Sequence, residues 1–336
     1  MIQQAIASLI ETRDLSRAEA AQVMREIMVG EATASQISGF LIALRMKGET
    51  VDEITGLAET MREFATRVTT SRRPLVDTCG TGGDRSGTFN VSTTAAFVVA
   101  GAGVAVAKHG NRSASSPCGS ADVLERLGVR IDASPERIGS CIDEVGIGFL
   151  FARTLHAAMK NVAPVRQELK VRTVFNLLGP LTNPAGACGQ IIGVPEVKLV
   201  DPLARVLAQL GTRRAFVVSG LDGLDEISLS GPTHVAEERG GSVRVYEIMP
   251  DEVGLARAPR EAILGGDATT NAGILRGVLE GKQGPHRDIV LLNAAAGILA
   301  GQNGEADWKD AVESARRSID SGAALGKLEE LVHYLR

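Results

Sequence analysis

Apolar side chains recur at helical spacing through the first 70 residues, and polar residues that begin helices stand between them. The stretch LSRAEAAQVMREIMVG opens with a capping box, Ser16 and Glu19, and stops at a glycine, the usual helix terminator. A second capping box, Thr50 with Glu53, opens a later helix. Apolar residues nearly encircle these short helices, so they must bury their faces on the rest of the chain or on a second subunit. The pattern predicts a small all-helical domain over residues 1–70.

After residue 70 short apolar runs alternate with amphipathic stretches. The runs predict strands in PLVDTCG, VAVAKHG, IGFLFA, QIIGV, RAFVVSG, VRVYEI and DIVLLNAA. The amphipathic stretches predict helices in SADVLERLG, SPERIGSCIDEVG, KLVDPLARVLAQLG and ATTNAGILRGVLEG. This alternation predicts a large α/β domain, residues 71–336, with a mainly parallel central sheet covered on both faces. Because ligands of such sheets gather beyond the carboxyl ends of the strands, the loops that follow strands are where site residues are expected.

Composition excludes several classes of protein. The net charge is −4 and only 3% of the residues are aromatic, which is unlike a protein that binds nucleic acid by charge and base stacking. The four cysteines lie far apart with no C-x-x-C pair, which argues against a zinc ribbon or a thioredoxin motif. The longest apolar run, TTAAFVVAGAGVAVA, is too short to span a bilayer, and the N-terminus lacks the basic start of a signal peptide. We expect a cytoplasmic protein with neither nucleic acid nor membrane as a partner.

The first stretch that could carry chemistry is the glycine-rich turn of VDTCGTGGD, residues 80–84. It follows a predicted strand but lacks the Lys-Ser/Thr of a Walker loop and the third glycine of a dinucleotide fingerprint. Its glycines allow backbone N–H groups to turn toward an anion. Asn90 and Ser92 are then predicted to cap a helix whose N-terminal dipole also favours an anion. A tight strand–helix turn with ordinary capping is the alternative.

The next predicted strand ends in AKHGNRSASSPCGSADVLERLG. Polar side chains beyond a fully apolar strand, followed by the small hydroxyls of SASS, predict a second wall that faces phosphate. The polar residues are Lys108, His109, Asn111 and Arg112. The following helix is expected to begin with a cap, Ser120 or Asp122.

Three carboxylates, Asp222, Asp225 and Glu226, crowd the loop of VSGLDGLDEISLSGPT. Adjacent carboxylates repel one another, and either a divalent cation or exposure to water relieves the repulsion. For the pair alone a solvated loop is the simpler explanation, whereas two neighbouring phosphate loops favour magnesium, which binds one or two carboxylates together with substrate phosphates.

A fourth segment, HAAMKNVAPVRQELKVRTVFNLLGPLTNP, reads as an irregular connector because prolines interrupt its helical pattern. It concentrates positive charge on a chain of negative net charge, which favours an anionic ligand. The charged residues are His156, Lys160, Arg166, Lys170 and Arg172, with Glu168 as the single acid. No arrangement of residues suggests a covalent nucleophile.

Taken together, these segments resemble the anthranilate phosphoribosyltransferase family over nearly the whole chain. The family's patterns occur in family order as GTGGD (80–84), NVST (90–93), KHGNR (108–112), GSAD (119–122), APVR (163–166), NLLGPLTNP (176–184), DGLDE (222–226) and GGDATTNA (265–272). Two positions depart from the family: LHAAMK replaces its usual His-His-Pro-x-Met-Lys at residues 155–160, and Pro117 stands where lysine is common.

The resemblance implies a nucleoside phosphorylase-like and phosphoribosyltransferase-like fold in which a connector around residues 165–185 returns to the helical domain. It further implies a homodimer through that domain. The implied reaction moves phosphoribosyl from phosphoribosyl pyrophosphate (PRPP) to the amine of anthranilate with magnesium, of which two ions are expected.

The resemblance also implies roles for individual residues. Arg166 would meet the anthranilate carboxylate, and Lys108 and Asp84 would act on the phosphates and the ribose. Ser92 would bind one magnesium ion, and Asp225 and Glu226 the second. The substrate-binding set carried over is Gly80, Thr81, Gly82, Gly83, Asp84, Thr88, Asn90, Ser92, Thr93, Lys108, His109, Gly110, Asn111, Ser120, His156 and Arg166.

Two alternatives remain open. A pyrimidine nucleoside phosphorylase shares the implied fold and also binds phosphate and ribose, but that family has a different sequence in the loop where KHGNR stands. A non-catalytic relative that binds nucleic acid or another ligand should be more basic and should have lost the acids of DGLDE, and neither is seen.

Overall fold

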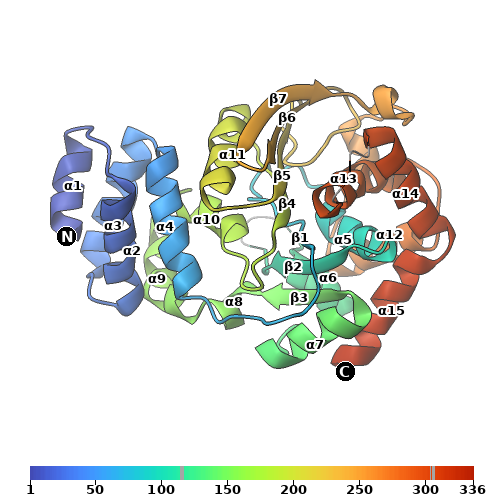
Figure 1. Ribbon diagram of the computed structural model, residues 1–336, viewed down its shortest axis with the longest axis horizontal. Coiled ribbons are helices and arrows are strands. Elements are labelled where there is room, and N and C mark those ends of the chain that lie inside the picture. Colours follow the sequence, from blue (N-terminus) through green and yellow to red (C-terminus); the bar gives the residue numbers. More distant parts are fainter. Residues whose placement is uncertain (114–116, 303, 305–306) are drawn as a thin grey trace.

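The computed structural model describes residues 1–113, 117–302, 304 and 307–336. Helices gather at one end of the molecule and a central sheet occupies the rest (Figure 1). The helical end is built from α1 (Ile2–Ile10), α2 (Arg17–Val29), α3 (Ala34–Lys47) and α4 (Val51–Glu63). Both predicted capping boxes are present, at the starts of α2 and α4, and α2 ends at Gly30 in the left-handed conformation. A third box, Thr33 with Gln36, begins α3 and was not predicted.

A seven-stranded sheet in the order β3-β2-β1-β4-β5-β6-β7 forms the centre. Its strands are β1 (Leu75–Asp77), β2 (Ala105–Gly110), β3 (Ile147–Phe151), β4 (Gly189–Gly193), β5 (Arg214–Gly220), β6 (Thr233–Arg239) and β7 (Ser242–Ile248). The first five strands pair in parallel, and β6 and β7 are antiparallel to their neighbours. Because the chain runs outward from β1 to β3 and then returns to β4, the loops after β1 and β4 lie side by side. This is the switch point where ligands of open sheets bind.

Helices cover both faces of the sheet. Alternate residues of a strand point to opposite faces, and accordingly Ile191 of β4 joins one core while Ile192 joins the other. The covering helices are α5 (Val91–Gly101), α6 (Ser120–Arg126), α7 (Pro135–Val145), α11 (Val200–Gln209), α12 (Ala268–Leu279), α13 (Pro285–Gly301), α14 (Trp308–Asp320) and α15 (Ala323–Leu335). Three short 3₁₀ turns connect elements, η2 (Val197–Leu199), η3 (Pro250–Val253) and η4 (Arg260–Ile263).

The segment after β3 runs back to the helical end. It contains α8 (Ala152–Leu155), the 3₁₀ turn η1 (Ala157–Asn161), α9 (Ala163–Leu169) and α10 (Phe175–Leu181). Helix α9 packs on α3, and α10 packs on α4. Apolar residues of this segment share one core with α1–α4, with α11 and with one face of the sheet. A domain boundary near residue 70 remains a prediction.

Two elements differ from the prediction. The run DIVLLNAA, predicted as a strand, lies in α13, where residues 289–301 are all buried. A helix surrounded by core is apolar on every side and loses the 3.6-residue pattern, so its apolar run reads like a buried strand. Strand β6 was not predicted, although its hairpin to β7 turns at Gly240 and Gly241, whose φ angles are +59° and +90°.

In the described part of the chain no helix combines the length and apolar character needed to cross a membrane. All four cysteines are free thiols.

Candidate active site

The glycine-rich turn after β1 meets the acidic loop after β5. The N–H of Thr81 donates to the carbonyl of Gly193 at the end of β4, with an N–O distance of 2.9 Å. Asp84 Oδ2 accepts a hydrogen bond from the Asp225 backbone N–H at 3.4 Å. Gly82 and Gly83 have φ angles of +65° and +92°, a conformation that glycine adopts readily. The two predicted segments therefore form one wall, although they lie far apart in sequence.

Asp225 and Glu226 concentrate negative charge at this wall. Burial, reinforced by the charges of Asp84 and Glu226, raises the pKa of Asp225 well above its usual value. Burial also raises the pKa of Glu226 to about 8; Lys108 acts in the opposite direction, and Asp84 adds to the rise. Partly buried carboxylates that repel one another need additional positive charge to remain ionised together. Their environment fits a divalent cation whose other ligands are substrate oxygens.

Asn293 of α13 holds the backbone beside this acidic pair, and sequence reasoning missed it. Its Oδ1 accepts the N–H of Ile227 at 2.9 Å, and its Nδ2 donates to the Ile227 carbonyl at 3.0 Å. Asn293 is buried in an otherwise apolar helix. A buried polar residue within an apolar run was the available signal, but the run was interpreted as a strand.

Lys108 and Ser92 lie beside Glu226. The Lys108 ammonium donates to the Thr78 carbonyl at 2.9 Å and to Ser92 Oγ at 3.4 Å. The Ser92 backbone opposes the rise in the pKa of Glu226, so these two residues are close together. Three predicted residues, Ser92, Lys108 and Glu226, are thus brought together. A recess that includes Ser92 and Glu226 is lined by Thr78, Gly80, Ser92, Ala95, Ile191, Gly193, Glu226 and Asn293.

Asp77, the last residue of β1, fixes the strand ends beneath the recess, and it too was missed. Its carboxylate accepts the backbone N–H of His109 at 3.0 Å and Nδ2 of Asn183 at 2.7 Å. Burial raises its pKa to about 6, against the opposing charge of Lys108. Asp77 is fully buried, and its contacts orient the start of the KHGNR segment.

His109 and His156 face each other, with ring centroids 5.1 Å apart. Burial lowers the pKa of His109 to about 3 and that of His156 to about 4, so both rings are neutral at pH 7. His109 Nδ1 lies 3.1 Å from the Gly179 carbonyl, and a neutral ring can only donate there. Among the described residues, its Nε2 is left as a buried acceptor without a partner, and Nε2 of His156 also lacks one.

Arg166 lies on α9, which packs against η1 immediately after His156. Its guanidinium carbon is 5.7 Å from the centroid of the Phe175 ring. The side chain makes no hydrogen bond or ion pair with any other described residue. Burial lowers the pKa of Arg166 from its ordinary value, yet an arginine stays protonated at neutral pH. A partly buried cation without a counter-ion is suited to an anionic ligand.

Other predicted residues serve structural contacts. Thr93 is buried beside an interior cavity that it shares with Phe97 and the stem of Lys108. Thr88 forms an isolated antiparallel β-bridge with Leu264. Thr88 Oγ1 also lies 3.0 Å from Ser86 Oγ.

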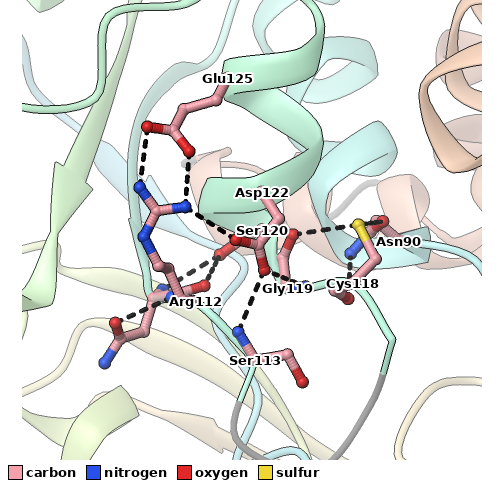
Figure 2. A network of polar contacts seen from close by, with 9 residues as sticks. Asn90, Arg112, Ser113, Cys118, Gly119, Ser120, Asp122 and Glu125 are labelled. Carbon is pink, nitrogen blue, oxygen red and sulfur yellow. Dashed lines mark hydrogen bonds and ion pairs between the residues drawn. The ribbon is translucent and has the colours of Figure 1, made fainter. Parts of the chain in front are cut away.

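The side-chain cap predicted at Asn90 is wrong, whereas of the two caps predicted for α6, Ser120 or Asp122, the structure shows Asp122 (Figure 2). Asn90 occupies the N-cap of α5, but its Nδ2 donates to the Cys118 carbonyl. Its Oδ1 accepts from Asn271, so no side-chain bond caps the helix. Ser120 Oγ instead bonds both the N–H and the carbonyl of Asn111. Asp122 accepts the N–H of Gly119, the N-cap residue, which supports the alternative given for α6.

In the same network Arg112 pairs with Asp122 and Glu125, so its charge is already balanced (Figure 2). Asn111 is exposed, and Gly110 ends β2. Most of the predicted wall of small hydroxyls, residues 114–116, lies outside the described residues.

No group of three or more His, Cys, Asp and Glu side chains is arranged to hold a metal ion anywhere in the described ranges. A cation here would therefore depend on fewer protein ligands together with oxygens of a substrate.

The chain matches two family models, the helical bundle domain of the glycosyl transferase family at residues 3–65 and the a/b domain of that family at residues 72–325. It is 58% identical over 334 residues to the anthranilate phosphoribosyltransferase of Symbiobacterium thermophilum, covering 98% of each chain. It is 59% identical over 332 residues to that of Anaeromyxobacter dehalogenans, covering 99% of this chain and 98% of the other. The chain belongs to the anthranilate phosphoribosyltransferase family.

Solved structures of the family agree with this fold. The anthranilate phosphoribosyltransferase of Thermus thermophilus superimposes with a TM-score of 0.94 at 49% identity, covering 99% of both chains. That of Saccharomyces cerevisiae, in complex with PRPP and Mg, gives 0.90 at 28% identity, covering 99% of this chain and 97% of the other. The resemblance noted in the sequence and the predicted fold class are thereby confirmed.

One departure from the usual motif of anthranilate phosphoribosyltransferases has a structural explanation. Leu155 is buried in the core, and its backbone carbonyl accepts the N–H of Thr66 at 2.8 Å. Its side chain is part of the core that contains the buried residues of β3. Ala157, two residues later, is exposed.

Proposed function

We propose that this chain transfers the 5-phosphoribosyl group from PRPP to the amine of anthranilate, with release of pyrophosphate, in tryptophan biosynthesis. The observation that carries the proposal is the meeting of the 80–84 turn with Asp225 and Glu226 beside Lys108 and Ser92. An anion-binding turn, a fixed ammonium and unbalanced carboxylates in one recess suit a substrate that carries both phosphate and metal.

Fixed dipoles and positive charge stabilise pyrophosphate, the leaving group. As the amine nitrogen bonds to the ribose carbon C1, the bond from C1 to the diphosphate oxygen breaks and its electron pair departs with pyrophosphate. Backbone N–H groups of the glycine turn, the N-terminus of α5 and Lys108 are placed to stabilise that charge. Asp84 accepts hydrogen bonds from the ribose hydroxyls and favours the positive charge that develops on the sugar.

Magnesium is the cofactor that these residues suit: Ser92 would hold one ion, and Asp225 and Glu226 would hold a second. When bound, magnesium supplies positive charge that neutralises the diphosphate.

The acceptor needs orientation more than activation, because an aromatic amine is already neutral at pH 7. Arg166 would pair with the anthranilate carboxylate. The unpartnered Nε2 of His109 is an acceptor suited to an N–H of the amine. His156 and Asn111 would border the aromatic ring of anthranilate. The amine proton is lost to water after the bond from nitrogen to C1 forms. Catalysis then rests on positioning and on stabilising the leaving group.

Replacing Arg166 by alanine should raise KM for anthranilate by about 10- to 100-fold and leave KM for PRPP nearly unchanged, since a charge-assisted pair contributes roughly 1.5–3 kcal/mol. Steady-state kinetics with each substrate varied in turn measures both constants. Exchange of Arg153, an exposed arginine of α8, for alanine is the matched control. Equal rises in both KM values would remove Arg166 from the acceptor site.

The experiment that tests the function follows anthranilate fluorescence with PRPP and magnesium each omitted in turn. Consumption only in the complete mixture supports the transfer. Phosphorolysis of thymidine without consumption of anthranilate would instead indicate a pyrimidine nucleoside phosphorylase.

A homodimer through the helical end is also proposed. Ile10 and Met46, on α1 and α3, expose 66% and 83% of their surfaces, and a second copy would cover them. The cytoplasmic location remains a prediction.

A further inference from the structure

Arg172 is a cation beside the glycine turn to which the proposed chemistry assigns no role. It lies between α9 and α10, six residues after Arg166, where the chain turns at Lys170 in the left-handed conformation. Its Nη1 donates to the carbonyl of Gly82 at 2.9 Å. A connector from the helical end thus reaches directly onto the turn that follows β1.

The turn passes close to this guanidinium. A Cβ atom placed on Gly83 would overlap Nη1 of Arg172, so a larger residue there would displace the guanidinium from its present position. By holding the Gly82 carbonyl on its own side, Arg172 leaves the N–H groups of the turn available to an anion in the recess.

Arg172 forms no ion pair with a carboxylate of the described residues. Its Nη2 is inaccessible to solvent and has no hydrogen-bond partner in the part of the chain that the structure describes. An electrostatic interaction links it to Glu196, but that carboxylate already pairs with Lys198 at 2.7 Å. Other arginines of the chain, such as Arg112 and Arg214, have carboxylates within ion-pair distance. A buried, charged N–H group without an acceptor destabilises the folded protein unless a ligand accepts a hydrogen bond from it.

We propose that Arg172 is a further substrate-binding residue, whose Nη1 fixes the glycine turn and whose Nη2 binds an oxygen of the diphosphate. The inference rests on the proposed function, because it takes the diphosphate to lie against residues 80–84. A planar guanidinium offers two parallel donors, and here one serves the protein and the other the ligand. Since Arg166 and Arg172 share one short segment, the acceptor carboxylate and the donor diphosphate would be bound from the same connector.

The test measures binding of inorganic pyrophosphate with magnesium by calorimetry, alongside steady-state kinetics, for Arg172→Ala and Arg172→Lys. Both variants should weaken pyrophosphate binding and raise KM for PRPP, the alanine variant by about 10- to 100-fold. The lysine variant should recover only part of this loss, because a single ammonium cannot occupy both positions. KM for anthranilate should stay close to the wild-type value, because Arg172 contacts the glycine turn and not the proposed acceptor site. Val171→Ala, an exposed neighbour on the same segment, is the matched control.

Unchanged pyrophosphate affinity in Arg172→Ala would overturn the inference, as would a rise confined to KM for anthranilate. Full recovery of pyrophosphate binding in Arg172→Lys would also overturn it, since charge alone would then suffice. Failure of the proposed function is a separate result. If wild type binds pyrophosphate through Arg172 but never consumes anthranilate, the transfer is wrong while the anion site remains.

Discussion

Replacing Glu226 by glutamine is expected to lower kcat/KM for PRPP by at least about 100-fold, and magnesium should no longer restore it. Glutamine preserves the size of the side chain but removes a negative charge from a recess where Asp84 and Asp225 already repel one another. Loss of a single group that stabilises reaction charge commonly costs about 3 kcal/mol. Kinetics over a range of magnesium concentrations measures the effect, with Glu247→Gln on the exposed edge strand as the control.

Stability gives a readout of the same change that is independent of catalysis. Burial raises the pKa of Glu226 from 4.5 to about 8, so between these values the folded protein binds more protons than the unfolded chain. The contribution of Glu226 to the free energy of unfolding therefore falls as pH rises through this window. Without magnesium, the Tm of wild type relative to the variant should decrease from pH 5 to pH 8. At pH 8 magnesium should raise the Tm of wild type more than that of the variant. Equal responses of both proteins to pH and magnesium would contradict the cation site.

Local sequence signals predicted most of the fold. They failed for the elements whose structure is determined by packing against distant parts of the chain. The capping boxes of α2 and α4 and the first five strands depend on neighbouring residues, and a sequence displays those directly. Helix α13 gave no such signal, because burial on every side removes its polar face. In β6 the buried Glu238 interrupts the apolar alternation, and the Gly-Gly turn after it was the signal that remained.

The same distinction applies to the site. The rule that chemistry gathers at strand ends was sufficient to select the glycine turn, Lys108 and the acidic pair. It could not select Asn293, which reaches Ile227 from a helix misread as a strand, or Arg172, which reaches Gly82 from a distant connector. Gly193 was also missed. A glycine at the end of a strand looks ordinary until the structure shows what packs against it.

Gly193→Ala should abolish nearly all activity while the protein still folds. The Gly193 carbonyl accepts two hydrogen bonds from Thr81, and a Cβ atom at residue 193 would overlap the backbone carbonyl of Asp225. The φ angle of Gly193 lies outside the positive range, so alanine fits the backbone itself, and the acidic loop must move instead. Displacement of reacting groups by about 1 Å can cost 100-fold in rate, so we expect kcat to fall by at least about that factor.

Overpacking of this kind costs about 1–3 kcal/mol of stability, which should lower the Tm of Gly193→Ala without unfolding it at 25 °C. Activity assays and circular dichroism on the same sample separate the two effects. Gly231→Ala is the matched control, because it follows the acidic loop, has no positive φ angle and has no atom within 4 Å of the added Cβ. That variant should keep wild-type kinetics. Wild-type kinetics in Gly193→Ala would contradict the proposed site. The recess would then tolerate displacement of the acidic loop, and catalysis would not need the close approach of the turn and the acids.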